Sequence, residues 1–200
     1  MEFKVSDEVK KARKPEYNIH PLILSRWSPR AFSGEEITDS QLMQLFEAAK
    51  WAPSSYNAQP WRFIYAKRNT EHWNTLFSLM GEFNQSWTKN AAVLAVIVSR
   101  KNFEHNEKPN GTANFDSGAA WENLALQAEY MGLAAHGMAG FDYEKARTAL
   151  SIPDTFKVEA MAAIGKKGKK ESLPKEMQER EAPSQRKSVK EIAMEGKFGG

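Results

Sequence analysis

The sequence predicts an α+β fold in which helices outweigh about four strands. Apolar residues recur at helical spacing in several segments, and these segments alternate with short aliphatic or aromatic runs of strand length. The 200 residues are 41% hydrophobic and 26% charged, which is ordinary for one domain with its own core.

Capping residues and prolines mark the boundaries of the expected helices. Ser6 and Thr38 suit helix N-caps, and Thr38 with Gln41 has the spacing of a capping box. Pro15 and Pro53 end the helices that precede them. The helices expected in the first half cover residues 6–13, 21–25, 38–52 and 71–82, and the strands cover 61–65 and 91–98.

The longest helix is predicted from Asp116 to Met131, with Asp116 as its N-cap and Gly132 as its stop. Small residues along it permit close packing against another helix. The elements expected after it are a strand at 133–139, a helix at 142–150 and a strand at 158–164. From Lys166 the chain becomes polar, so this tail is either disordered or an arm that needs another surface to order it.

The composition excludes several classes of protein. There are no cysteines, so disulfides and thiolate chemistry are excluded, and any redox chemistry must come from a bound cofactor. A net charge of +3 is too small to indicate a nucleic-acid partner. No apolar run approaches the roughly 20 residues of a membrane span, and the charged N-terminus lacks a signal-peptide core, so a cytoplasmic protein is expected. Motifs of phosphate loops, dinucleotide-binding folds and zinc proteases are absent, and nothing indicates a metal site.

The first candidate site consists of Arg26, Ser28 and Arg30, which lie within five residues. The planar fork of arginine matches phosphate oxygens, and serine adds a further donor. The two arginines converge if the chain turns at Pro29. The alternative is that they are solvated arginines beside a turn.

The second candidate site is the loop from Pro53 to Trp61. Its Ser54, Ser55, Asn57 and Gln59 carry more hydrogen-bonding capacity than a linker needs. Side-chain amides suit both the donors and the acceptors of a flat polar ring. The alternative is a helix stop followed by an ordinary turn. Together the two segments suggest a site for a phosphorylated aromatic cofactor.

The same segments resemble the FMN-dependent nitroreductase family. The matching stretches are 26–32, 53–63, 115–120, 123–128, 132–133, 138–142 and 164–165. Their order and spacing argue against chance. The resemblance implies a nitroreductase-like fold, with a central, mostly antiparallel sheet flanked by helices. It also implies an intertwined homodimer that exchanges its C-terminal arms and holds FMN at the subunit interface.

The resemblance assigns the FMN phosphate to one group of residues. Arg26, Ser28 and Arg30 match the positions that hold the phosphate and the ribityl chain. Trp27 lies between them, and Arg186 matches a late arginine that returns to the phosphate.

The flavin ring is assigned to three other segments. The residues that match a loop reaching the ring from the partner subunit are Pro53, Ser54, Ser55 and Asn57. Asn84 matches an amide at the pyrimidine edge of the ring. Met138, Ala139 and Gly140 match a strand end along the ring, and the amide of Ala139 is expected to face flavin N5.

The family likeness divides the chain into an FMN-binding domain at 1–165 and an arm at 166–200 that wraps the partner subunit. The implied activity is an oxidoreductase that takes hydride from NADH or NADPH and reduces nitroaromatics, quinones or similar small molecules by a ping-pong mechanism. The flavin carries the chemistry, so no catalytic side chain is assigned. The alternatives are a flavin-binding module without turnover, or another flavin chemistry such as enone reduction or dehalogenation.

Overall fold

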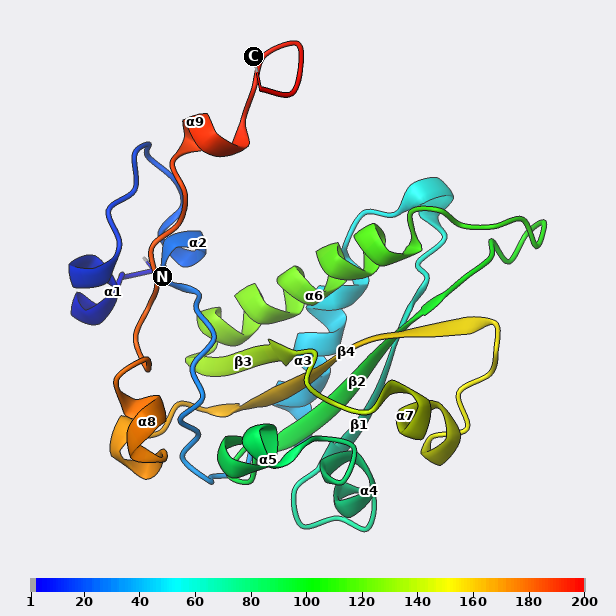
Figure 1. Ribbon diagram of the computed structural model, residues 1–200, viewed down its shortest axis with the longest axis horizontal. Helices are drawn as coiled ribbons and strands as arrows, with labels where there is room; N and C mark the ends of the chain where they lie inside the picture. Colours follow the sequence, from blue (N-terminus) through cyan, green and yellow to red (C-terminus); the bar gives the residue numbers. More distant parts are fainter. Residues whose placement is uncertain (1–2, 200) are drawn as a thin grey trace.

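Four antiparallel strands form the central sheet in the computed structural model, which describes residues 3–199 (Figure 1). The strands are β1 (Trp61–Lys67), β2 (Val93–Arg100), β3 (Leu133–Met138) and β4 (Phe156–Lys166), and they lie in the order β1-β2-β4-β3. Each neighbouring pair is antiparallel. The predicted α+β class and antiparallel sheet are therefore confirmed.

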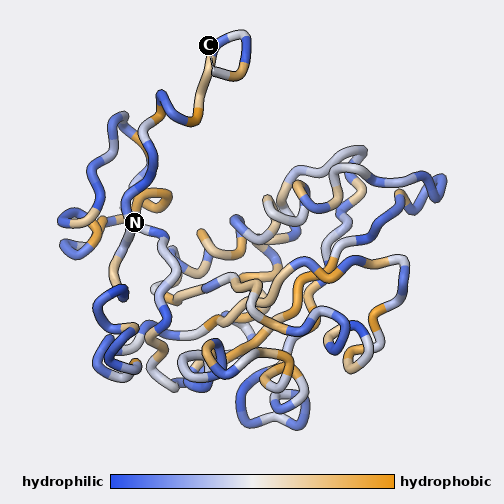
Figure 2. The backbone as a smooth tube through the Cα atoms, in the orientation of Figure 1, coloured by the Kyte–Doolittle hydropathy of each residue, from blue (hydrophilic) through white to orange (hydrophobic). Residues whose placement is uncertain are grey.

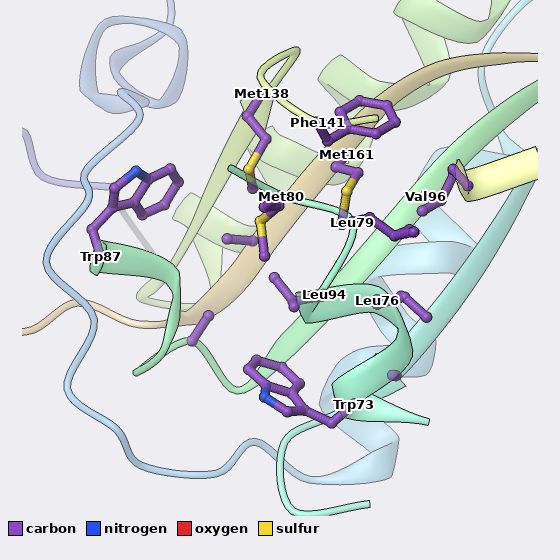
Figure 3. Packing of buried hydrophobic residues seen from close by; sticks show 14 of the residues in the cluster. Trp73, Leu76, Leu79, Met80, Trp87, Leu94, Val96, Met138, Phe141 and Met161 are labelled. Carbon is purple, nitrogen blue, oxygen red and sulfur yellow. The ribbon is translucent and has the colours of Figure 1, made fainter. Parts of the chain in front are cut away.

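Each face of the sheet carries its own hydrophobic cluster, because side chains alternate along the strands. On one face, α3 (Asp39–Lys50) and the long helix α6 (Ala113–Tyr130) pack together over Val93 and Ile164. The other face carries α4 (Trp73–Phe77), α5 (Glu82–Thr88) and α7 (Tyr143–Ala149). Figure 3 shows the second cluster, in which Met80, Met138 and Met161 gather with aromatic side chains. Figure 2 shows the apolar residues concentrated on the central strands.

Several predicted helix boundaries are confirmed. Helix α1 (Asp7–Ala12) is capped by Ser6, and α2 (Pro21–Ser25) begins at its proline. Thr38 and Gln41 form the predicted capping box of α3. Gly132 stops α6 at a positive φ of 70°, a conformation that glycine adopts readily.

The single helix predicted at 71–82 is wrong, because the structure has two short helices, α4 and α5, with a break before Gly81. Met80 leaves the helical path to form a β-bridge with Phe141. The amide of Gln85 donates to the carbonyls of Phe77 and Met80 at 3.3 and 2.8 Å. These bonds satisfy acceptors that a continuous helix would have used itself.

The prediction that Asp116 caps the long helix is also wrong. Helix α6 begins at Ala113, with Thr112 at the N-cap position. Asp116 lies inside the first turn, where its buried carboxylate accepts bonds from the N–H of Ser55 and the hydroxyl of Thr112. Its role is therefore to hold a distant loop.

The first half of the predicted arm packs on its own chain. Gly168 donates to the carbonyl of Ala31, and α8 (Lys175–Gln178) buries Met177 in the core. Beyond Pro183 the chain runs beside the N-terminal segment, and α9 (Val189–Ile192) projects away from the sheet (Figure 1). The boundary after residue 165 stays a prediction, since contacts to the core continue for almost twenty residues past it. Over the same described residues, the helices lack the combination of length and apolar character that a membrane crossing requires.

Candidate functional site

Residues 26–30, here called the arginine segment, follow α2 without regular secondary structure. Arg26 Nε lies 3.1 Å from Glu122 Oε1, and its Nη1 lies 3.4 Å from the Ser28 hydroxyl. Arg30 has a buried Nε for which residues 3–199 provide no hydrogen-bond partner. The structure therefore joins Arg26 to Ser28 and leaves a buried donor of Arg30 unsatisfied among residues 3–199, which suits the binding of an anion.

Three side chains that the sequence interpretation missed hold the backbone of this segment. Arg13 Nη1 donates to the carbonyls of Leu24 and Arg26 at 2.6 and 2.7 Å. His136 Nδ1 lies 3.0 Å from the carbonyl of Pro29. Glu181 accepts the N–H groups of Arg30 and Ala31. Arg13 directly follows α1, His136 lies in β3 and Glu181 lies beyond α8, so no local pattern links them.

The electrostatics around the segment favour an anion. Burial lowers the pKa of Arg13, and the charges of Arg186 and Arg26 lower it further. Burial raises the pKa of Glu129, against the opposing pull of Lys167, Arg26 and Arg13. Positive charge is thus crowded here, and a bound phosphate would relieve it.

His136 is neutral at physiological pH. Burial lowers its pKa to about 4, against the hydrogen bond to the carbonyl of Pro29, and the charge of Arg30 lowers it further. Because a carbonyl only accepts, Nδ1 carries the proton of the neutral ring and donates it to Pro29. The ring also packs 4.6 Å from that of Trp87.

Trp27 and Arg186, the other two residues predicted for the phosphate site, differ in their exposure to solvent. Trp27 is buried, and Lys167 Nζ lies 4.3 Å above its ring centre. Arg186 is exposed and donates to the hydroxyl of Ser184 at 2.8 Å, within range of the charge of Arg13.

The loop at 53–60 is strained. Tyr56, Asn57 and Gln59 have φ angles of 51, 53 and 45°, a region that residues other than glycine rarely occupy. The hydroxyl of Ser54 accepts the N–H of Gln59, and Asp116 accepts the N–H of Ser55. Pro53 and Asn57 are exposed. Strain of this kind clusters at functional sites, where surrounding contacts enforce it.

The loop and the arginine segment lie near opposite ends of α6 (Figure 1). Asp116 holds the loop, whereas Glu129, whose pKa responds to Arg26 and Arg13, lies by the arginine segment. These two positions are about 20 Å apart along the helix, but Glu122, which pairs with Arg26, lies only about 9 Å from Asp116 at 1.5 Å per residue. Within residues 3–199, no hydrogen bond or ion pair joins the loop to the arginine segment.

The end of β3 lies closer to the arginine segment. Ala139 is exposed, and its N–H finds no acceptor within residues 3–199. Ala139 follows His136 by three residues, which in an extended chain is about 10 Å. An unpaired N–H therefore lies about 10 Å along the chain from His136, whose ring contacts the arginine segment at Pro29.

Asn84 meets the end of β3 at Gly140. Its Nδ2 donates to the carbonyl of Gly140 at 2.8 Å, and its Oδ1 accepts the indole N–H of Trp87 at 3.1 Å. A Cβ at Gly140 would lie 2.7 Å from Nδ2, so this close approach requires glycine. Met138 is buried in the adjoining core. Both groups of the Asn84 amide are thus engaged within the chain.

These features fit a phosphorylated ligand with a flat hydrogen-bonding ring. The orphaned Arg30 Nε and the crowded positive charge suit the phosphate, and the free N–H of Ala139 suits a ring acceptor. Across the part of the chain that the structure describes, no group of three or more His, Cys, Asp or Glu side chains is arranged to hold a metal ion.

A comparison with known families identifies the chain. The sequence model described as the nitroreductase family matches residues 23–166. The chain belongs to this family. The resemblance predicted from the motifs is therefore confirmed, and membership of this family supports an oxidoreductase.

Solved structures support the same fold for this chain. It is 46% identical to a chain described as an oxidoreductase containing FMN, with a TM-score of 0.90 and coverage of 94% of this chain and 96% of that one. A Desulfovibrio desulfuricans protein, described as a "putative nitroreductase in complex with fmn", is 23% identical, with a TM-score of 0.71 and coverage of 92% and 99%. The nitroreductase-like fold is therefore confirmed.

Among sequence relatives, a Polynucleobacter asymbioticus protein named "Putative NADH dehydrogenase/NAD(P)H nitroreductase" is 27% identical over 179 residues. The match covers 80% of this chain and 91% of that protein. The similarity thus extends over nearly the whole of that relative.

Proposed function

We propose that this nitroreductase binds FMN and takes hydride from NADH or NADPH to reduce nitroaromatics, quinones or similar small molecules. The observation that carries the proposal is the pairing of a cationic cluster at Arg26 and Arg30 with the free N–H of Ala139. The 46% identical relative that contains FMN supports the choice of cofactor.

The proposed phosphate contacts come from the arginine segment. Arg26, Ser28 and Arg30 would hold the phosphate and ribityl chain, with Arg186 adding charge from the C-terminal side. Trp27 would act by packing, since its ring is covered by Lys167. Guanidinium groups suit this task because they form paired, charge-assisted bonds to phosphate oxygens.

The proposed ring contacts come from the end of β3. Met138, Ala139 and Gly140 would lie along the ring, with the N–H of Ala139 directed to N5. Asn84 would border the pyrimidine edge and fix Gly140 through the bond it already makes. When bound, FMN supplies the hydride chemistry, and these residues supply position and a backbone donor. Donor and acceptor would share one open face in turn, which predicts ping-pong kinetics.

We further propose that a second copy of the chain completes each site. The loop residues Pro53, Ser54, Ser55 and Asn57 make no hydrogen bond or ion pair with the arginine segment of their own chain within residues 3–199. A homodimer would bring the loop of one subunit to the arginine segment of the other. The arm would then wrap the partner, which accounts for exposed apolar residues such as Ile192 and Phe198.

An absorption spectrum of the purified protein tests the cofactor and the activity together. We expect flavin bands, either on purification or after adding FMN, that bleach under anaerobic conditions with NADPH or NADH. Reoxidation by a nitroaromatic or a quinone would complete the cycle. Bound flavin that neither nucleotide bleaches would instead indicate a binding module. Failure to retain any FMN would reject the proposal.

A further inference from the structure

The carboxylate of Glu181 is buried directly beneath the arginine segment. Only 6% of the residue is exposed. Its Oε1 accepts the backbone N–H groups of Arg30 and Ala31, both at 2.8 Å. These partners lie 151 and 150 residues away in the sequence, so the contact exists only in the folded protein.

The arginine segment depends on contacts of this kind. It has no helix or strand of its own, so its backbone groups must find partners elsewhere. Glu181 is well placed to provide them, because Met177 of α8 is buried in the core and fixes the preceding turn. The carbonyl of Ala31 is held from the same C-terminal stretch by the N–H of Gly168, at 2.7 Å.

The second oxygen of Glu181 needs an explanation. Oε2 is buried, and residues 3–199 give it neither a hydrogen bond nor a basic partner within 4.0 Å. Burying a carboxylate oxygen without a hydrogen-bond partner costs free energy, so such a group needs another explanation. Here it occupies the two backbone N–H groups that flank the Cα of Arg30.

We infer that Glu181 is a positioning residue for the proposed phosphate site. Glu181 holds the N–H groups of Arg30 and Ala31, which flank the Cα of Arg30. It thereby fixes the direction in which the Arg30 side chain leaves the backbone. The phosphate is then bound by guanidinium groups and not by backbone amides. This inference rests on the proposed binding of FMN. Its consequence is that Glu181 contributes to the preference for FMN over riboflavin, which lacks the phosphate.

The test compares the dissociation constants of FMN and riboflavin for the full-length protein, measured by quenching of flavin fluorescence. In Glu181→Ala we expect FMN to bind about tenfold more weakly, because a misdirected guanidinium loses a charge-assisted bond. Riboflavin should bind within about twofold of the wild type, since its ring contacts are unchanged. Glu181→Gln keeps an acceptor oxygen and should restore the preference for FMN. Glu179→Ala, at an exposed neighbouring position, is the matched control.

A merely structural role would weaken both flavins in parallel, and that result would overturn the inference. So would unchanged binding of both. If Glu181→Ala does not fold, Glu181→Asp withdraws the carboxylate by one methylene while keeping its charge. The same selective loss of FMN is then expected, and unaltered FMN preference would count against Glu181. A wild-type protein that binds riboflavin as tightly as FMN would instead reject the proposed phosphate site itself.

Discussion

Single side chains set the charge balance of the arginine segment. Arg26 pairs with Glu122 through Nε and contacts Ser28 through Nη1, so its guanidinium is held before any ligand binds. Arg30 has a buried donor without a partner among the described residues. A preordered guanidinium loses less side-chain entropy on binding than a free one.

Replacing Arg26 by alanine should weaken FMN binding by about 2 kcal/mol, because a charge-assisted phosphate contact is removed. Titration of the protein with FMN measures this. Arg147→Ala removes the same charge from α7, away from the segment and the loop, and should leave the affinity unchanged. An equal loss of FMN affinity in the two variants would show that the affinity depends only on the net charge of the protein.

His136 should make stability sensitive to acid. Its pKa is about 4 in the folded protein and about 6.5 when unfolded, so the unfolded chain takes up its proton first. The free energy of unfolding should therefore fall as the pH drops from about 6.5 to about 4. For this half-buried ring we expect a loss on the order of 2 kcal/mol, with solvent screening considered.

Urea denaturation at a series of pH values checks this expectation against His136→Gln, which keeps a donor for the carbonyl of Pro29. The difference between the two proteins should depend on pH only in that window. His105→Gln, in an exposed loop, should retain the wild-type profile. Parallel profiles for wild type and His136→Gln would contradict the assignment.

At the scale of elements, α6 organises the site. Its first turn holds the strained loop through Asp116, its middle pairs Glu122 with Arg26, and Glu129 lies near its far end. Buried alanines such as Ala120, Ala125 and Ala128 allow α6 to pack closely against α3 and the sheet. The helix therefore separates the two halves of the site by a fixed length.

Replacing Asp116 by alanine should release the loop. The N–H of Ser55 would lose its acceptor, at a cost of about 1–3 kcal/mol in the free energy of unfolding, whereas the hydroxyl of Thr112 would still reach Asn110 Oδ1 at 2.9 Å. Hydrogen exchange at the Ser55 amide should accelerate more than the global stability explains. Asp154→Ala, at a fully exposed side chain, serves as control. Unchanged exchange at Ser55 would show that strain in the loop is held by other contacts.

At the scale of the whole molecule, the proposed dimer follows from where the chain places its polar and apolar surfaces. The loop with Tyr56 and the tail beyond Pro183 both expose large apolar side chains. The groove between the N-terminal segment and the tail is lined by Tyr17, Ile19, Val189 and Ile192. Surfaces of this kind are typical of contacts between subunits.

Charging the tail tests the arm. The double substitution Ile192→Asp and Met194→Asp should weaken the dimer and reduce FMN binding together, because each site would lose the loop supplied by its partner. Sedimentation at several protein concentrations measures the first effect and flavin fluorescence the second. Lys190→Ala, on the same short helix, should leave both unchanged. If the double variant keeps the dimer and binds FMN as the wild type does, the arm does not contribute to the interface.

Local chemistry in the sequence determined the fold class and much of the element pattern. Some signals act over only a few residues, so they can be recognised in the sequence alone. Examples are the capping box at Thr38, the stop at Gly132 and the apolar run of β2. The helix expected at 71–82 and the cap expected at Asp116 failed because distant partners, Phe141 and Ser55, decided them. The candidate arginines were visible as a motif, whereas Arg13, His136 and Glu181, which hold that motif, were not. Only the tertiary structure joins them, because a buried hydrogen bond between residues 150 positions apart leaves no periodicity or spacing in the chain.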